Sequence, residues 1–204
     1  HDMDYVGRSE YVGKNILING DFSRADYGTT VTNTTSSYNN IMLNRWVMYY
    51  NGDSVTQGTD TIRGKLCYTF DATTGGTDGF FIKQKVENGS YRFSGDTLTG
   101  SIDVYRTIDE PIRIALGFSN GTSTNSGYEQ MDEVICEPPL FEWTRIYVTA
   151  KMNDPYVSLT RHLMFFIKQY GNVPSVSVLK LANAQLERND RPTAVEDVPP
   201  AIQL

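Results

Sequence analysis

The stretch FFIKQKVE, residues 80–87, decides the fold class. Its residues divide between two faces: Phe80, Ile82, Gln84 and Val86 share one, and Phe81, Lys83, Lys85 and Glu87 share the other. Because successive side chains of a β-strand point to opposite faces of a sheet, this period of two predicts a strand with one buried face.

The same alternation recurs along the chain. Further strand-like segments are TLTGSIDVY (97–105), residues 112–118, FEWTRIYVTA (141–150), LTRHLMFFI (159–167) and VSVLKLANAQL (176–186). Segments rich in turn-forming residues, such as GGTDG and YGNVP, separate them. No stretch combines helical periodicity with caps. We therefore predict an all-β fold, an antiparallel jelly-roll β-sandwich of two sheets.

Composition limits the domain organisation and the function. The chain has 204 residues, 39% of them hydrophobic and 12% aromatic, enough for the core of one large domain. We expect an N-terminal extension or linker over 1–14, the sandwich over 15–192 and a C-terminal tail over 193–204. The first residues lack the apolar region of a signal peptide. A net charge of −6 argues against nucleic-acid binding, and no apolar run approaches membrane-spanning length.

Catalytic motifs are missing from the sequence. Its two histidines are His1 and His162, and no nucleophile elbow, Cys–His signature, zinc motif or phosphate loop is present. The 24 acidic residues do not single out a glycosidase pair. We therefore expect a protein that is not an enzyme. Cys67 and Cys136 are either paired or free, and a small buried thiol is the simpler interpretation of Cys67.

Several short motifs carry a family resemblance through their order. NILINGDFSR (15–24) is followed by Trp46, FFIKQKVE with a buried Gln84, TLTGSIDVY, Trp143-x-x-x-Tyr147 and LANAQLERNDRPTAVE (181–196). Together these resemble the C-terminal jelly-roll module of bacteriophage tail fibres and tail spikes, which is similar to the carbohydrate-binding modules of glycosidases. Pro192 lies within the last motif, and we expect it to end the closing strand because proline cannot donate to a sheet.

The resemblance implies a virion protein at the tip of a fibre or spike. It implies binding of polysaccharide on the host bacterial surface and a homotrimer attached to upstream fibre or spike domains, without nucleic acid or membrane insertion. Two alternatives stay open. One is a purely structural trimerisation or capping domain, and the other is the carbohydrate-binding module of a glycoside hydrolase.

Two polar segments, residues 23–44 and 119–139, lack clear alternation and are expected to be loops. A sugar offers an apolar C–H face flanked by hydroxyls, so a contact needs an exposed aromatic ring beside free donors and acceptors. The candidates in these segments are Tyr27, Tyr38, Tyr128, Asn33, Asn39 and Asn125. The alternative is that these tyrosines pack their own loops. Trp46 is expected in the core rather than on a sugar.

Acidic residues offer one candidate metal site. The resemblance to sugar-binding jelly rolls implies that Asp21 with Glu187 holds a structural calcium, whereas a solvated aspartate in an Asn-Gly-Asp turn is the alternative. No other cofactor is expected. The acidic group Glu129, Asp132, Glu133 and Glu137 is expected to be solvated surface.

Overall fold

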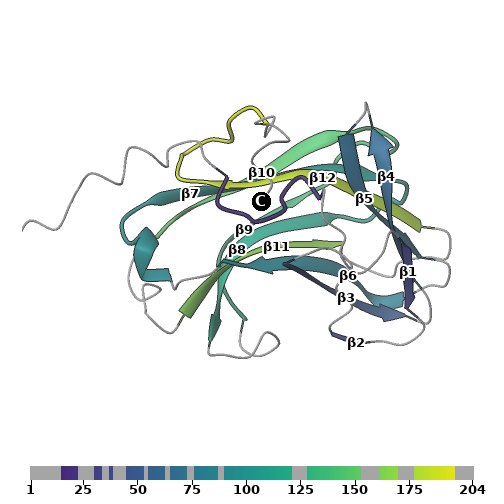
Figure 1. Cartoon of the computed structure of the whole chain (residues 1–204), viewed down its shortest axis with the longest axis horizontal. Coiled ribbons are helices and arrows are strands. Elements are labelled where there is room, and N and C mark those ends of the chain that lie inside the picture. The colour runs from purple at the N-terminus through teal and green to yellow at the C-terminus, as the bar shows by residue number, and fades with distance from the viewer. Residues whose placement is uncertain are drawn as a thin grey trace, which may run out of the picture.

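Two antiparallel six-stranded sheets pack face to face (Figure 1). The structure is a computed structural model that describes residues 15–22, 30–33, 37–38, 45–52, 55–62, 65–72, 76–86, 90–120, 128–152, 161–169 and 177–195. In these ranges the one helical element is the 3-10 turn η3 (Ser90–Phe93), and no helix there is long and apolar enough to span a bilayer. The predicted all-β sandwich is confirmed.

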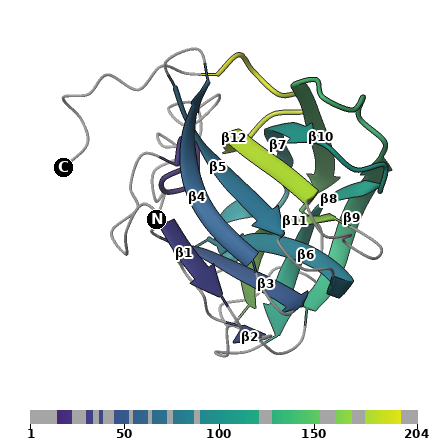
Figure 2. The same cartoon turned by 90° about the vertical axis from the view of Figure 1, so that its right-hand side faces the viewer.

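Each sheet joins strands that are distant in the sequence. Sheet A has the order β1 (Thr30–Asn33), β4 (Val55–Ile62), β5 (Lys65–Ala72), β12 (Ser177–Glu187), β7 (Thr97–Arg106) and β10 (Thr144–Lys151). Sheet B has the order β2 (Ser37–Tyr38), β3 (Trp46–Gly52), β6 (Gly76–Lys85), β11 (Arg161–Gln169), β8 (Ile112–Asn120) and β9 (Tyr128–Cys136). The edge strands β9 and β10 lie side by side and close one side of the sandwich (Figure 2).

The core lies between the sheets and follows the alternation of the sequence. In β8 the inward residues Ile112, Ile114, Leu116 and Phe118 are all completely buried. Gly100 of β7 faces the Phe165 ring of β11, and a Cβ built on Gly100 would lie 2.5 Å from that ring. Only a residue without a side chain lets the sheets approach this closely here. Cys67 is buried, and neither Cys67 nor Cys136 forms a disulfide.

Residues 15–22 fill the space between the two sheets. On the sheet A side, the Ile16 amide donates to the Leu186 carbonyl at 2.7 Å and the Ala184 amide donates to the Gly20 carbonyl at 2.8 Å. On the sheet B side, the Gln84 side chain donates to the Ile18 carbonyl at 2.7 Å and accepts from the Ile18 amide at 2.8 Å. The motif around Asn15 is therefore a structural plug, and the predicted burial of Gln84 is confirmed.

Trp46 belongs to the core, as predicted. It is 2% exposed, its ring meets the Phe22 ring edge-on at a centroid distance of 5.3 Å, and its indole N–H donates to the Asn19 carbonyl at 3.1 Å. A buried tryptophan needs a partner for this donor, and residues 15–22 supply it. Trp46 is thus not available to stack on a sugar.

The closing strand ends earlier than the sequence suggests. β12 stops at Glu187, before Pro192, and it contains a bulge in which Asn183 has a φ of 52°. The exit then stays on the domain, because Arg188 Nε donates to Asp96 at 2.8 Å and the Thr193 amide donates to Glu187 at 3.0 Å. Charged and polar side chains, rather than the proline, decide where the strand ends.

The two polar segments are not loops throughout. Residues 30–33 and 37–38 form β1 and β2, and residues 128–136 form β9 at the edge of sheet B. For these residues the loop prediction is wrong. An edge strand contacts only one neighbour, so polar residues are tolerated at many of its positions and the period of two disappears from the sequence.

Candidate functional site

The side of sheet B that faces away from sheet A carries a group of basic and aromatic side chains, of which Lys83, Met164 and Phe166 are buried. We name it the cationic face and define it by Phe81, Lys83 and Lys85 of β6, Arg113 of β8, Glu133 of β9, and Met164, Phe166 and Lys168 of β11. These residues point outward because their neighbours, among them Ile82, Ile114 and Phe165, fill the core. The same alternation that builds the core therefore builds this face.

Strand register brings the aromatic residues together. Lys83 pairs with Phe166, and Phe81 pairs with Lys168, which in turn pairs with Arg113. The Phe81 and Phe166 rings lie next to each other, with centroids 5.3 Å apart. Lys83 Nζ lies 5.6 Å from the Phe81 centroid, and the Arg113 guanidinium carbon lies 5.5 Å from that of Phe166. Each cation is thus held close to an aromatic ring.

The electrostatics of this face are unusual for a chain with net negative charge. Arg113 forms an ion pair with Glu133, the one acidic side chain among the described residues of the face. Lys83 is only 9% exposed, and burial together with the nearby charge of Lys85 lowers the pKa of its ammonium group. Like charges have been placed side by side in a partly dehydrated position, which costs stability.

His162 lies beside this group. It precedes Leu163 in β11 and pairs with Ser119 of β8. Burial and the charge of Lys85 lower the pKa of the His162 imidazole. Its Nδ1 atom is buried and makes no hydrogen bond within the part of the chain that the structure describes. The imidazole is therefore neutral near pH 7 and has unused hydrogen-bonding capacity.

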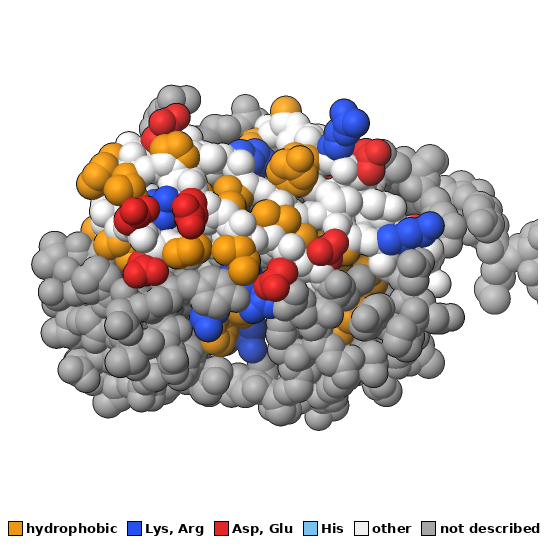
Figure 3. Space-filling view, turned by 180° about the vertical axis from the view of Figure 1, so that it is seen from behind, with side chains coloured by type: hydrophobic (Ala, Val, Ile, Leu, Met, Phe, Trp, Pro, Cys, Tyr) orange, Lys and Arg blue, Asp and Glu red, His pale blue; other side chains and the backbone are white. Residues whose placement is uncertain are grey.

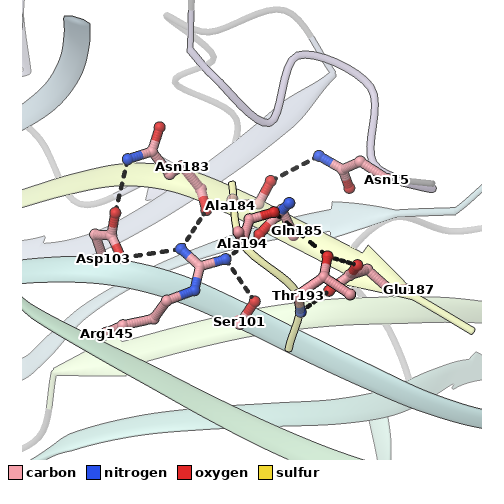
Figure 4. Close-up of polar contacts among 10 residues, drawn as sticks. All are labelled: Asn15, Ser101, Asp103, Arg145, Asn183, Ala184, Gln185, Glu187, Thr193 and Ala194. Carbon is pink, nitrogen blue, oxygen red and sulfur yellow. Dashed lines mark hydrogen bonds and ion pairs between the residues drawn. The ribbon is translucent and has the colours of Figure 1, made fainter. Parts of the chain in front are cut away.

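The opposite face, on sheet A, uses its polar groups internally (Figure 4). The Arg145 guanidinium donates to Asp103 at 2.9 Å, to Ser101 at 2.8 Å and to the Asn183 carbonyl at 3.2 Å, and it also contacts Gln185. The Asn183 side chain in turn donates to Asp103 at 2.6 Å. The cluster fixes the bulge of β12, so we interpret it as structural.

Aromatic residues also occur on sheet A. The rings of Tyr105 and Trp143 lie 5.7 Å apart, with Lys180 Nζ 5.8 Å from the Tyr105 centroid, and Tyr147 is 51% exposed. This group carries fewer cations than the cationic face. It provides a matched surface for control substitutions.

Surface composition differs between regions of the described surface. Its exposed large hydrophobic side chains are Ile18, Val134, Ile135, Leu140, Phe141 and Tyr147. Figure 3, seen from behind, shows hydrophobic and acidic side chains interspersed over the upper part of the molecule. Low in the middle of that view, Lys and Arg side chains gather beside hydrophobic ones.

The sequence-based sugar contacts are not brought together among the described residues. Tyr38 of β2 pairs with Tyr49, and Tyr128 of β9 pairs with Ser119, so these two tyrosines lie on opposite edges of sheet B. Asn33 is in β1 of sheet A. Their expected place in loops is wrong for these three. Tyr27, Asn39 and Asn125 lie outside the described residues, and glycan contact by the whole set stays a prediction.

The calcium site also stays a prediction. The amide and hydroxyl of Thr193 donate to the two oxygens of the Glu187 carboxylate. Asp21 follows Gly20, which bonds Ala184, so Glu187 lies about 10 Å further along β12 at 3.3 Å per residue. The described residues contain no group of three or more His, Cys, Asp or Glu side chains that could hold a metal ion. Calcium needs six to eight oxygen ligands, of which these two carboxylates alone supply a minority.

The acidic group of the sequence divides in the structure. Glu133 pairs with Arg113, whereas Asp132 and Glu137 are exposed, as expected for solvated surface. The backbone of Glu129 pairs with Phe118 in β9. Sequence reasoning missed the cationic face, although its signal was present: Phe81 and Phe166 alternate with core residues and must therefore point outward.

Comparison with known proteins identifies the fold. No protein-family model and no curated protein sequence matches the chain. A protein from Bacteroides thetaiotaomicron proposed to bind sugar has a similar structure, with a TM-score of 0.55 and 12% identity over 86% of this chain and 100% of its own. A cyclase from Fischerella sp. gives a TM-score of 0.57 and 11% identity over 87% of this chain and 96% of its own.

A third similar structure is TmCBM61 in complex with β-1,4-galactotriose. Its TM-score is 0.47, with 14% identity over 86% of this chain and 99% of its own. At 11–12% identity, the similarity to the first two structures shows the fold alone, which in this chain is a two-sheet β-sandwich. A binding protein and an enzyme both use this fold, so function must be argued from the site.

Proposed function

We propose that this chain is a carbohydrate-binding module without catalytic activity, and that it binds sugar on the cationic face. The observation that carries the proposal is the contact between the half-buried Phe81 ring and the buried Phe166 ring on the outer side of sheet B, with Lys83 and Arg113 beside them. Aromatic rings take the C–H face of a sugar, and the basic side chains donate hydrogen bonds to its hydroxyls.

The setting of the site extends the proposal. Guided by the order of its sequence motifs, we place the module at the tip of a bacteriophage tail fibre or tail spike, on the virion, where it binds host surface polysaccharide as a homotrimer. In this arrangement Tyr27, Tyr38 and Tyr128, with Asn33, Asn39 and Asn125, add further sugar contacts. Three linked sites raise avidity without any new contact. A capping domain or the module of a glycoside hydrolase is the alternative.

A glycan array tests the binding function. The purified chain is applied to bacterial capsule and lipopolysaccharide glycans together with Phe81→Ala and, as a matched control on the opposite sheet, Tyr147→Ala. We expect the original chain and Tyr147→Ala to retain the same glycans and Phe81→Ala to lose them while keeping its melting temperature. Equal retention by all three proteins would place the site elsewhere. New reducing ends in the bound glycan would mean that the protein is an enzyme.

Assembly is tested separately. Val134 and Ile135 on the edge strand β9 are 40% and 55% exposed, an apolar edge that a homotrimer would cover. Sedimentation equilibrium at micromolar concentration is expected to give the trimer mass, and Ile135→Lys is expected to shift it to the monomer. A monomer for the unmodified chain would contradict the homotrimer.

A further inference from the structure

The connection between β9 and β10 exposes two neighbouring apolar side chains. Phe141 is 65% exposed, Leu140 is also exposed, and neither belongs to the core. The connection passes from sheet B to sheet A, because β9 and β10 are edge strands of different sheets. It lies against the end of β7, since the Phe141 amide donates to the Arg106 carbonyl at 2.9 Å. The exposed pair therefore lies where the chain joins the two sheets.

Phe141 has a strained backbone. Its φ is 59°, in the left-handed region that glycine and asparagine adopt readily and that bulky residues avoid. Glycine at this position would make the same turn without the strain and without an exposed ring. The sandwich itself therefore gains nothing from a phenylalanine here. Strain of this kind, held in place by the surrounding structure, is found more often at functional positions.

Arg106 holds the connection in place. Its side chain is buried, and its guanidinium donates to the Pro138 carbonyl at 2.5 Å and to the Glu110 carbonyl at 2.6 Å. Through these bonds and the bond from Phe141, one arginine ties the β9–β10 connection to the β7–β8 connection. The Phe141 ring is thus presented by a preorganised segment, which lowers the entropic cost of binding a partner.

Acidic side chains surround the exposed pair. Residues 106–111 and 136–143 contain four acidic residues, and the buried Arg106 is their one basic residue. The side chain of Asp109 is exposed. Glu137 and Glu142 are also exposed, and neither forms an ion pair within the part of the chain that the structure describes. We name this surface the acidic end and define it by Asp109, Glu110, Glu137, Leu140, Phe141 and Glu142.

We propose that the acidic end binds a basic, apolar segment of another protein. Apolar side chains of that segment pack on Phe141 and Leu140, and its lysines or arginines pair with Glu137 and Glu142. An aromatic anchor with a polar rim is typical of a protein–protein interface, and complementary charge selects the partner.

Charge disfavours this chain itself as the occupant. Two copies repel each other overall, because each carries a net charge of −6. The terminal segments fit no better: residues 196–204 contain two acidic residues and no lysine or arginine, and residues 1–14 contain more acidic than basic residues.

Synthetic peptides test the two requirements separately. The full chain is titrated at low salt with a labelled peptide that alternates lysine and leucine. Its counterparts carry glutamate in place of lysine, or serine in place of leucine. We expect the lysine–leucine peptide to bind at least about tenfold more tightly than either counterpart. Equal binding of the lysine–leucine peptide and either counterpart, or no binding at all, would overturn the proposal.

Phe141→Gly separates binding from folding. The substitution removes the ring and relieves the positive φ, so we expect binding of the lysine–leucine peptide to fall at least about tenfold while the melting temperature stays the same or rises. Tyr147→Ala removes an exposed ring from the outer side of sheet A and is expected to bind the peptide normally. Unchanged binding by Phe141→Gly, or an equal loss in both variants, would contradict the proposed anchor.

Charge-removing variants locate the electrostatic part. Glu137→Gln and Glu142→Gln are each expected to weaken binding of the lysine–leucine peptide about threefold to tenfold at low salt. Asp190→Asn removes the same charge beside Thr149, near the other end of β10, and is expected to bind normally. Equal loss in all three variants would reduce the effect to net charge and overturn the proposal.

The acidic end and the proposed sugar site are separate. Phe141→Gly is therefore expected to retain the same glycans as the unmodified chain and to sediment with the same mass. A lower mass for Phe141→Gly would mean that a second copy of the chain covers the acidic end, and the proposed partner would be wrong. Failure of the peptides to bind would leave sugar binding on the cationic face unaffected.

Discussion

Gln84 of sheet B holds the N-terminal segment through a pair of hydrogen bonds to the Ile18 backbone. The Gln84 amide nitrogen donates to the Ile18 carbonyl at 2.7 Å, and its amide oxygen accepts from the Ile18 N–H at 2.8 Å. An amide side chain is the one group that offers a donor and an acceptor in this geometry without charge. Gln84 therefore gives the Ile18 backbone the two hydrogen bonds that a neighbouring strand would otherwise provide.

Replacing Gln84 by leucine is expected to destabilise the protein by about 1–3 kcal/mol, because both backbone groups of Ile18 lose their partner. Urea unfolding measures the change. Arg191→Ala, an exposed substitution in the same domain, is expected to change the free energy of unfolding by less than about 0.5 kcal/mol. A Gln84→Leu variant as stable as the unmodified chain would show that residues 15–22 are held by other contacts.

Gly100→Ala is expected to destabilise the sandwich by about 1–3 kcal/mol, since the new methyl group would lie 2.5 Å from the Phe165 ring. In a Gly100→Ala, Phe165→Leu double variant, the smaller leucine side chain makes room for the new methyl group. The effects of the two substitutions on stability should therefore be non-additive. A double-mutant cycle of melting free energies checks this. Purely additive effects would mean that the sheets shift to make room.

Arg145→Lys is expected to cost about 1–3 kcal/mol although the charge is kept, because lysine cannot reproduce the forked contacts to Asp103, Ser101 and Gln185. Glycan binding by this variant is expected to be unchanged at temperatures where it is folded. Lost binding with intact stability would move the functional site to sheet A.

Lys83→Met is expected to raise the melting temperature at pH 7. The lowered pKa of Lys83 means that the folded state binds its proton less tightly than the unfolded state, so the charged form costs stability. As pH rises through this lowered pKa towards the ordinary lysine value, the folded chain releases the proton and the advantage of the variant should shrink. Calorimetry between pH 7 and high pH measures the difference. A stability advantage of Lys83→Met that grows with pH would contradict the idea that the charged Lys83 ammonium group destabilises the folded chain.

Lys85→Gln is expected to raise the pKa of His162, because it removes the positive charge that lowers it. Burial would still hold the imidazole below its ordinary value. NMR titration of the histidine ring measures both values, and Lys151→Gln is the charge-matched control. An unchanged His162 pKa in Lys85→Gln would mean that the two side chains do not interact.

Local patterns predicted much of this structure. Alternation identified six of the twelve described strands and the outward position of Phe81, and the burial of Trp46 was expected from the large area of its ring. It could not identify β9, whose place at the sheet edge removes the need for an apolar face. The contact between Phe81 and Phe166 depends on the register of β6 against β11, which is set by long-range pairing and leaves no local signal.

The loop placement of three candidate sugar contacts is wrong, whereas their contact with glycan stays a prediction. Tyr38, Tyr128 and Asn33 lie in strands. The side chains that the structure does bring together are lysines, arginine and phenylalanines from strand interiors. Phe81 alternates with core residues and shares its side of β6 with Lys83 and Lys85, and this pattern is the sequence signal of the cationic face.

The contact between Asn15, Ile16 and the end of β12 has a mechanical consequence. The chain enters the domain where β12 finishes, and these segments run antiparallel, from Ile16 opposite Leu186 to Gly20 opposite Ala184. A pull between entry and exit therefore loads their hydrogen bonds one after another, so the contact unzips at low force. Leu17 and Phe22 would leave the core first, while β6, β8 and β11 carry none of the tension. A force applied through an attached partner would thus open the contact between residues 15–22 and β12 before it reached the strands that carry the cationic face.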